Sequence, residues 1–289
     1  MNYHQPVLLH EVLTQLDPQP GQIFLDATLG HGGHTIEILK KGAIVYGLDA
    51  DPKNQLIAIN RINELNLSQN FIPLKGNFSR IYDIWKKQIL KPLDGILVDL
   101  GLSVNQQSED NNRGFSFNDS MSLDMRLNPK TQTLTAEEII NTWDKEQLYQ
   151  LFTKYTQEKL AKPLVFEIIK ARQINPIKNG LELSNIIHSY YQKKHYSTYH
   201  HPATKIFLAL RIAVNHEFDN LKKILEASLK ICKQDGKIAI ISFHSGEDRL
   251  VKQFISKNQI SSQKFLPTHQ EIKKNPLSRS AVLRFYKTK

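Results

Sequence analysis

The chain has 289 residues, a formal net charge of +10, 40% hydrophobic residues and a mean hydropathy of −0.40, as expected for a globular protein with one large domain or a domain with an insertion. No apolar run approaches the ~18–20 residues of a membrane span, and the N-terminus has no signal-peptide pattern. With Cys232 as the single cysteine, an intrachain disulfide is excluded. We therefore expect a cytoplasmic protein without a membrane association, a metal site or an obligate protein partner.

Basic residues are unevenly distributed along the chain. The segment Leu250–Lys289 carries nine lysines and arginines and a single acid, Glu271. Such a segment favours a polyanionic partner, nucleic acid first, although a solvated lysine-rich surface would have the same composition. Tyrosines, lysines and histidines also alternate in Tyr190–His201, which suits base stacking and phosphate contacts or, equally, a polar linker.

The first strand signal leads into a glycine-rich turn. Ile23–Leu25 predicts a buried strand, Gly30–Gly33 a turn, and the sequence from His34 a helix start. Glycines let a backbone approach a ligand closely, and a helix N-terminus offers N–H groups to an anion. Asp26, just before the turn, would not favour a pyrophosphate. It would favour a ligand with both a cation and an anion, such as S-adenosylmethionine.

Two further strand signals follow at short intervals. Ala43–Leu48 predicts a strand that ends at Asp49, 19 residues after Gly30, which is the usual distance from a glycine turn to the acid that binds a ribose diol. Phe71–Leu74 predicts a third strand, and Phe78 beyond it could flank an adenine or serve only in packing.

A fourth strand, Ile96–Asp99, completes a group of three acids. Ligands of open α/β sheets bind at the carboxyl ends of the strands. Asp26, Asp49 and Asp99 each end a predicted strand, so we expect them at one edge of a parallel sheet. A single aspartate there is more often a helix cap, but three beside a glycine turn indicate a binding site.

The alternation of strands and helices then stops. Residues 108–202 are first irregular and then helical, so we predict that they form a helical insertion for substrate recognition. The sheet domain would consist of residues 1–107 and 203–289, with a fifth strand at Lys237–Ser242. Two final strands, in 264–266 and 281–286, would pair like a hairpin at the sheet edge.

Nine segments spread over nearly the whole chain, in a fixed order and spacing, carry a resemblance: Asp26–His34, Asp94–Gly101, Arg113–Phe117, Leu123–Arg126, His201–Thr204, Arg211–Asn215, Ser242–Ser245, Glu247–Arg249 and Ser280–Arg284. The sequence resembles the class I S-adenosylmethionine-dependent methyltransferases and, among them, the RsmH/MraW family of bacterial cytosine-N4 methyltransferases of 16S ribosomal RNA. The resemblance implies an α/β Rossmann-like sheet with an inserted helical domain. It also implies methylation of a cytidine in the decoding region of the small ribosomal subunit.

The resemblance also implies the cofactor contacts, which fall on Gly32, Gly33, His34, Asp49, Phe78, Asp99 and Gln106. Amides near Gly32–His34 would hold the methionine carboxylate, and Asp49 the ribose hydroxyls. Phe78 would pack near the adenine, and Asp99 would attract the ammonium or sulfonium side.

The catalytic group stays open. Ser103, Asn105 and the backbone near Leu100 are candidates for the cytosine amine, and His244 is either a second candidate or a structural histidine. The segment Leu102–Gln106 departs from the family pattern because the second serine and the proline are missing. Without that proline, the backbone at Gln106 is no longer preset. Gly246 also replaces a usual leucine.

Two other classes of function fit part of the sequence. A nicotinamide-dependent oxidoreductase would use the glycine turn and Asp49, but the third glycine of the dinucleotide fingerprint is missing. A non-enzymatic RNA-binding or ribosome-assembly protein would explain the basic segment but would not need three converging carboxylates. Methyl transfer to DNA or protein is a variant that the charge does not separate from RNA methylation.

Overall fold

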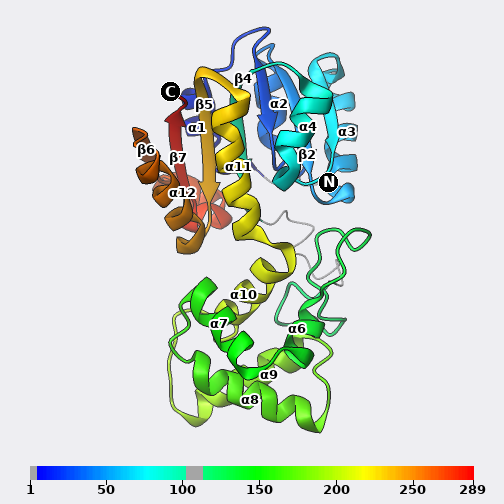
Figure 1. Ribbon diagram of the computed structural model, residues 1–289, viewed down its shortest axis with the longest axis vertical. Coiled ribbons are helices and arrows are strands. Elements are labelled where there is room, and N and C mark those ends of the chain that lie inside the picture. Colours follow the sequence, from blue (N-terminus) through cyan, green and yellow to red (C-terminus); the bar gives the residue numbers. More distant parts are fainter. Residues whose placement is uncertain (1–4, 102–112) are drawn as a thin grey trace. The chain divides into compact units, whose positions relative to one another are not determined.

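The computed structural model describes residues 5–101 and 113–289, and Gln106 lies outside them. Internal contacts divide the chain into two compact units: a sheet unit, residues 1–103 with 218–289, and a helical unit, residues 104–217 (Figure 1). In the described part of the chain, no helix combines the length and the apolar character that a membrane crossing requires.

The sheet unit is built on a seven-stranded mixed sheet with the strand order β3-β2-β1-β4-β5-β7-β6. Its strands are β1 Ile23–Asp26, β2 Ile44–Asp49, β3 Phe71–Lys75, β4 Leu93–Asp99, β5 Cys232–Ser242, β6 Ser262–Phe265 and β7 Val282–Lys287. β1 to β5 run parallel, and β7 is antiparallel to both β5 and β6. This arrangement confirms the predicted Rossmann-like α/β sheet of a class I methyltransferase.

Helices cover both faces of this sheet (Figure 1). They are α1 Leu9–Leu16, α2 Gly33–Leu39, α3 Pro52–Glu64, α4 Ile81–Ile84, α11 Glu217–Ile231, α12 Ser245–Lys257 and α13 His269–Lys274, with short 3-10 turns at Ser68–Asn70, Phe78–Arg80 and Pro276–Ser280 and a π-helix, η3, at Trp85–Ile89. α1, α2 and α3 share one apolar cluster with the sheet, and α4, α11 and α12 share the other. Along β4, Leu97 joins the first cluster while Ile96 and Val98 join the second, as the two-residue period of a strand requires.

The last two strands pair as predicted at the sheet edge, but they do not form a tight hairpin. β6 lies at the edge and β7 lies between β6 and β5. α13 and the 3-10 turn at Pro276–Ser280 stand between the two strands in the chain.

The helical unit contains α6 Ala136–Thr142, α7 Lys145–Thr156, α8 Ala161–Ile174, α9 Gly180–Lys193 and α10 Thr204–Asn215. Thr135 caps α6, and Asp144 with Gln147 forms a capping box on α7. The apolar side chains of all five helices form one cluster. Because α10 belongs to that cluster, the second boundary between the units lies at 217/218 and not at the predicted 202/203.

Candidate cofactor site at the carboxyl edge of the sheet

Asp26, Asp49 and Asp99 lie at one edge of the sheet, as the strand signals predict. They end the neighbouring parallel strands β1, β2 and β4. In the sheet register, Asp26 stands beside Gly47 of β2 and Leu97 of β4. Three carboxyl groups therefore meet where the glycine turn leaves β1.

The Asp26 side chain is buried and held by two threonines. Its Oδ2 accepts a hydrogen bond from Thr35 Oγ1 at 2.7 Å, and its Oδ1 accepts one from the Thr28 amide at 3.1 Å. Burial raises the pKa of Asp26 to about 6, although both hydrogen bonds act against the rise. Asp26 thus fixes the glycine turn between β1 and α2.

Asp99 presents a buried acceptor. Its amide donates to Thr28 Oγ1 at 2.6 Å, which ties the end of β4 to the end of β1. Its Oδ1 is buried and accepts no hydrogen bond from the described residues, while its Oδ2 lies 3.8 Å from His34 Nδ1. Burial, followed by the charges of Asp26 and Glu247, raises the pKa of Asp99 to about 7. A cation or a hydrogen-bond donor placed at this edge would satisfy the carboxylate.

Asp49 joins the end of β2 to the glycine turn. Its two oxygens accept the amides of Gly30 and Asp51, each at 2.7 Å. Burial raises the pKa of Asp49 to about 7 against these hydrogen bonds. An ionised carboxylate has about four lone-pair sites, so Asp49 keeps capacity for the hydroxyl groups of a ligand.

The glycines of the turn differ in what surrounds them. Gly30 and Gly32 have positive φ angles of 52° and 76°. A Cβ at Gly30 would meet only Thr28 O at 3.9 Å, whereas a Cβ at Gly33 would lie 2.8 Å from Pro6 Cγ. Space for a ligand thus exists at Gly30, and the missing side chain at Gly33 serves the packing of the N-terminal segment.

Two of the other predicted contacts are placed by the structure, and one is not. His34 is buried, and its Nε2 lies 2.9 Å from Val7 O. Phe78 opens the 3-10 turn Phe78–Arg80 and packs, half buried, against the apolar cluster of α4 and α11. Gln106 lies outside the described residues, as do the candidate catalytic residues Ser103 and Asn105.

Known proteins resemble this sequence over nearly its whole length, in both the sheet unit and the helical unit. The model of the MraW methylase family matches residues 1–263. A ribosomal RNA small subunit methyltransferase H from Mycoplasmopsis agalactiae is 38% identical over 98% of this chain and 97% of its own length. The protein of the same name from Deinococcus deserti is 36% identical over 97% and 92%.

The chain belongs to the MraW methylase family. The MraW methylases are S-adenosylmethionine-dependent methyltransferases, so the predicted recognition and the predicted cofactor are confirmed. A solved structure of a putative rRNA-methylase from Clostridium thermocellum aligns over 99% of both chains with a TM-score of 0.49 at 11% identity.

Sequence reasoning missed several groups that shape the site of this MraW methylase. Thr28 and Thr35 hold Asp26, and Thr28 also accepts the amide of Asp99. Glu247 is buried, accepts the Phe243 amide at 2.8 Å and adds its charge to the surroundings of Asp99. Thr28 and Thr35 flank the glycine turn in the sequence. Their position beside the turn is the sequence feature that could have indicated their hydrogen bonds to Asp26 and Asp99.

His244 lies at the start of α12, where its ring is 5.7 Å from that of Phe218 and its Nε2 is 3.2 Å from Glu247 Oε1. These contacts hold the His244 ring at the helix start, and its buried Nε2 forms no hydrogen bond with the described residues. They leave His244 without an assigned catalytic role in this MraW methylase.

Proposed function

We propose that this protein transfers the methyl group of S-adenosylmethionine to N4 of a cytidine in 16S ribosomal RNA, within the decoding region of the small subunit. Membership of the MraW methylase family supports methyl transfer. The names of the relatives, ribosomal RNA small subunit methyltransferase H, support an RNA substrate from that subunit, and the net charge of +10 agrees with a polyanion. The reaction would take place in the cytoplasm, where ribosomal subunits are found.

The observation that carries the site assignment is the buried Asp99 Oδ1, which has no hydrogen-bond partner among the described residues. S-adenosylmethionine supplies a methyl group on a sulfonium and also carries an ammonium. The ionised Asp99 would attract this positive side of the cofactor, because attraction between charges is strong in a buried site. Burial of a carboxylate oxygen without a hydrogen-bond partner is costly, so a bound cofactor that reaches Asp99 Oδ1 would relieve an unfavourable feature of the protein.

The remaining cofactor contacts are assigned by position. Asp49 would accept hydrogen bonds from the ribose hydroxyls, and Phe78 would pack near the adenine. The Gly32 amide donates to Leu29 O at 2.7 Å, so the carboxylate of the methionine moiety would fall to the amides of Gly33 and His34. Gln106 would complete the set.

The low nucleophilicity of the cytosine N4 amine determines what the protein must do to promote methyl transfer. The lone pair of an exocyclic amine is delocalised into the cytosine ring, so the nitrogen is a weak nucleophile. The protein would align it behind the methyl group and accept a hydrogen bond from the amine as the N–C bond forms, the S–C bond breaks and one amine proton leaves. Such alignment lowers the activation barrier by several kcal/mol. A cytosine that is stacked in the RNA must also be turned out of the stack to reach the site. We propose that the helical unit recognises the surrounding RNA.

The test is a transfer assay with purified protein, methyl-labelled S-adenosylmethionine and small subunits from cells that lack this activity. Digestion of the RNA to nucleosides should give label in N4-methylcytidine. Label in another nucleoside would contradict the cytosine-N4 assignment. Cofactor binding without any labelled RNA would leave a methyltransferase with another substrate, and absence of cofactor binding would favour an RNA-binding or assembly protein.

A further inference from the structure

The amino edge of the sheet, opposite the aspartates, carries a cluster of lysines and aromatic rings. α4 and the π-helix η3 lead into β4, and α11 leads into β5. Leu93 at the start of β4 pairs with Cys232 at the start of β5. Two helices that are far apart in the sequence therefore end side by side at this edge.

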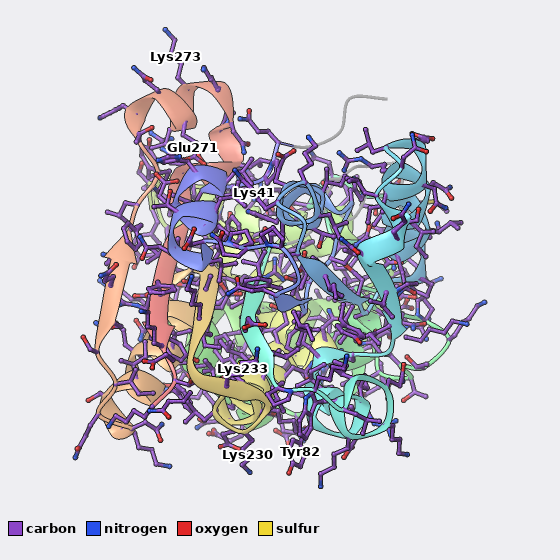
Figure 2. All side chains as sticks on the ribbon, turned by 90° about the horizontal axis from the view of Figure 1, so that it is seen from above. Lys41, Tyr82, Lys230, Lys233, Glu271 and Lys273 are labelled. Carbon is purple, nitrogen blue, oxygen red and sulfur yellow. The ribbon has the colours of Figure 1, made fainter. Side chains whose placement is uncertain are left out.

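Tyr82 lies at the centre of this cluster. Lys86 Nζ, from η3, is 4.4 Å from the centre of its ring, and Lys230 Nζ, from α11, is 5.5 Å from it. Both distances are within the range of cation–π contacts. Trp85 stacks beside Tyr82 at 6.0 Å with an interplanar angle of 15°. In Figure 2 the labelled side chains of Tyr82, Lys230 and Lys233 gather on the same side of the sheet unit. One ring therefore brings two ammonium groups together.

The positive charge of the cluster is largely uncompensated. Lys86, Lys87, Lys91 and Lys230 are exposed, and none of them forms an ion pair within residues 5–101 and 113–289. A neighbouring lysine at the same edge, Lys233, does form an ion pair, because its Nζ lies 2.9 Å from Asp94 Oδ1. Asp83 is the acid of α4, and α11 carries Glu217, Asp219 and Glu226, of which Glu226 is the nearest in sequence to Lys230. We call Tyr82, Trp85, Lys86, Lys87, Lys91 and Lys230 the amino-edge patch.

We propose that the amino-edge patch binds the phosphate backbone of the RNA substrate at a point remote from the methylated nucleotide. This inference rests on the proposed function, which supplies RNA as the polyanion. Two ammonium groups on one ring repel each other, and neighbouring phosphates of an RNA backbone, one beside each ammonium, would neutralise both. Contacts to phosphates position a protein on a nucleic acid without reading its sequence, and lysines on flexible stems suit that role.

The distance between the two edges of the sheet decides which RNA substrates can contact the amino-edge patch while they fill the cofactor-side site. β4 has seven residues, from Leu93 to Asp99, and a strand rises about 3.3 Å per residue, so the two edges are about 20 Å apart. An RNA fragment that extends less than about 20 Å from the site at Asp99 does not reach the patch. An assembled small subunit can contact both edges at once. The patch therefore favours the assembled subunit, or long RNA, over a short fragment.

The test compares two double variants with the unchanged protein. Lys86→Ala/Lys230→Ala removes the two ammonium groups at Tyr82. Lys222→Ala/Lys223→Ala removes the same charge from exposed positions near the start of α11 and is the control. KM is measured on small subunits and on a short hairpin with the methylated segment. Binding of full-length 16S RNA is measured separately as a function of salt.

The patch variant should raise KM for small subunits several-fold and leave KM for the hairpin and kcat unchanged, while the control stays near the unchanged protein. Loss of two phosphate contacts should also lower the slope of log affinity for 16S RNA against log salt by roughly 1.4–1.8. An unchanged KM and slope would overturn the proposal, as would an equal loss on the hairpin. A lower melting temperature with unchanged RNA binding would show that these lysines only offset helix dipoles.

The proposed function can fail independently of this inference. Absence of methyl transfer by the unchanged protein would overturn the proposed function. The salt dependence of 16S RNA binding would still decide whether the amino-edge patch binds RNA. Reduced binding to vesicles of anionic phospholipid, with unchanged binding to RNA, would overturn the inference in favour of a lipid surface.

Discussion

Asp26, Asp49 and Asp99 have pKa values raised to about 6, about 7 and about 7, in each case mainly by burial. A carboxyl group whose pKa is higher in the folded than in the unfolded protein binds more protons when folded. Its contribution to stability is therefore fully present below the unfolded value of 3.8 and is lost as the pH rises towards the folded value. The cofactor-free protein should lose stability between about pH 4 and pH 7.

Asp99→Asn should remove part of this pH dependence, because an amide does not ionise. Urea unfolding of the cofactor-free proteins at pH 5 and pH 8 should show a smaller loss of stability for Asp99→Asn than for the unchanged protein. S-adenosylmethionine should bind the unchanged protein more tightly as the pH rises through about 7, because deprotonation creates the charge that attracts the cofactor. An identical pH profile of cofactor affinity in both proteins would remove Asp99 from the positive side of the cofactor.

Asp49→Ala tests the ribose contact. The variant should weaken S-adenosylmethionine binding by ~1–3 kcal/mol, because buried hydrogen bonds to hydroxyl groups are lost. Isothermal titration calorimetry measures the affinity, and Asp219→Ala, which removes an exposed carboxyl paired with Lys222, is the control. Unchanged affinity in Asp49→Ala would place the ribose elsewhere.

The meeting of the three aspartates was predictable, because each follows an apolar strand and parallel strands end at one sheet edge. The partners of Asp26 were not, because the positions of the Thr28 amide and of Thr35 Oγ1 depend on the path of the turn. Nor does the sequence indicate that His34 Nε2 lies 2.9 Å from the carbonyl of Val7, 27 residues earlier.

At the scale of elements, the glycine turn is a junction of β1, α2 and the N-terminal segment. Gly33→Ala should destabilise the protein, because its Cβ would lie 2.8 Å from Pro6 Cγ. Overpacking of this kind typically costs about 1–3 kcal/mol. Pro6→Ala in the same chain should recover part of the loss, since it removes the contacted atom. Urea denaturation of the single and double variants measures both effects, and additive losses would contradict this packing.

Helix starts with side-chain caps have a signal in the sequence, because Thr135 with Glu138 and Asp144 with Gln147 have the spacing of a capping box. The extent of the sheet domain was harder to predict. α10 has the apolar pattern of any buried helix, and only its contacts with α6 and α7 assign it to the helical unit. β5 likewise begins at Cys232, before the predicted Lys237, with an irregularity in its pairing with β4 between Leu93 and Gly95.

At the scale of the whole molecule, the two units have separate apolar cores. One cluster contains only residues of the helical unit, and the other two contain only residues of the sheet unit. Phe152→Ala, in the fully buried centre of the helical unit, should cost about 3–5 kcal/mol there. The affinity for S-adenosylmethionine should change little, because every proposed cofactor contact except Gln106 belongs to the sheet unit.

Calorimetry with and without cofactor measures this independence. The cofactor should raise the melting temperature of the sheet unit, whereas Phe152→Ala should lower that of the helical unit. A single transition that both changes shift equally would show that the two cores unfold together.

The N-terminal segment that packs on the glycine turn is itself held by α13. Glu271 Oε1 accepts the Leu8 amide at 2.7 Å across a separation of 263 residues, and Asn275 Nδ2 donates to Gln5 O at 3.1 Å. During synthesis, Pro6, Val7 and Leu8 must await a partner that is made 263 residues after Leu8. Contacts so distant in sequence form late in folding. A nascent chain halted before α13 would therefore have an incomplete cofactor site, so competence for methylation would arise only after the ribosome has added α13.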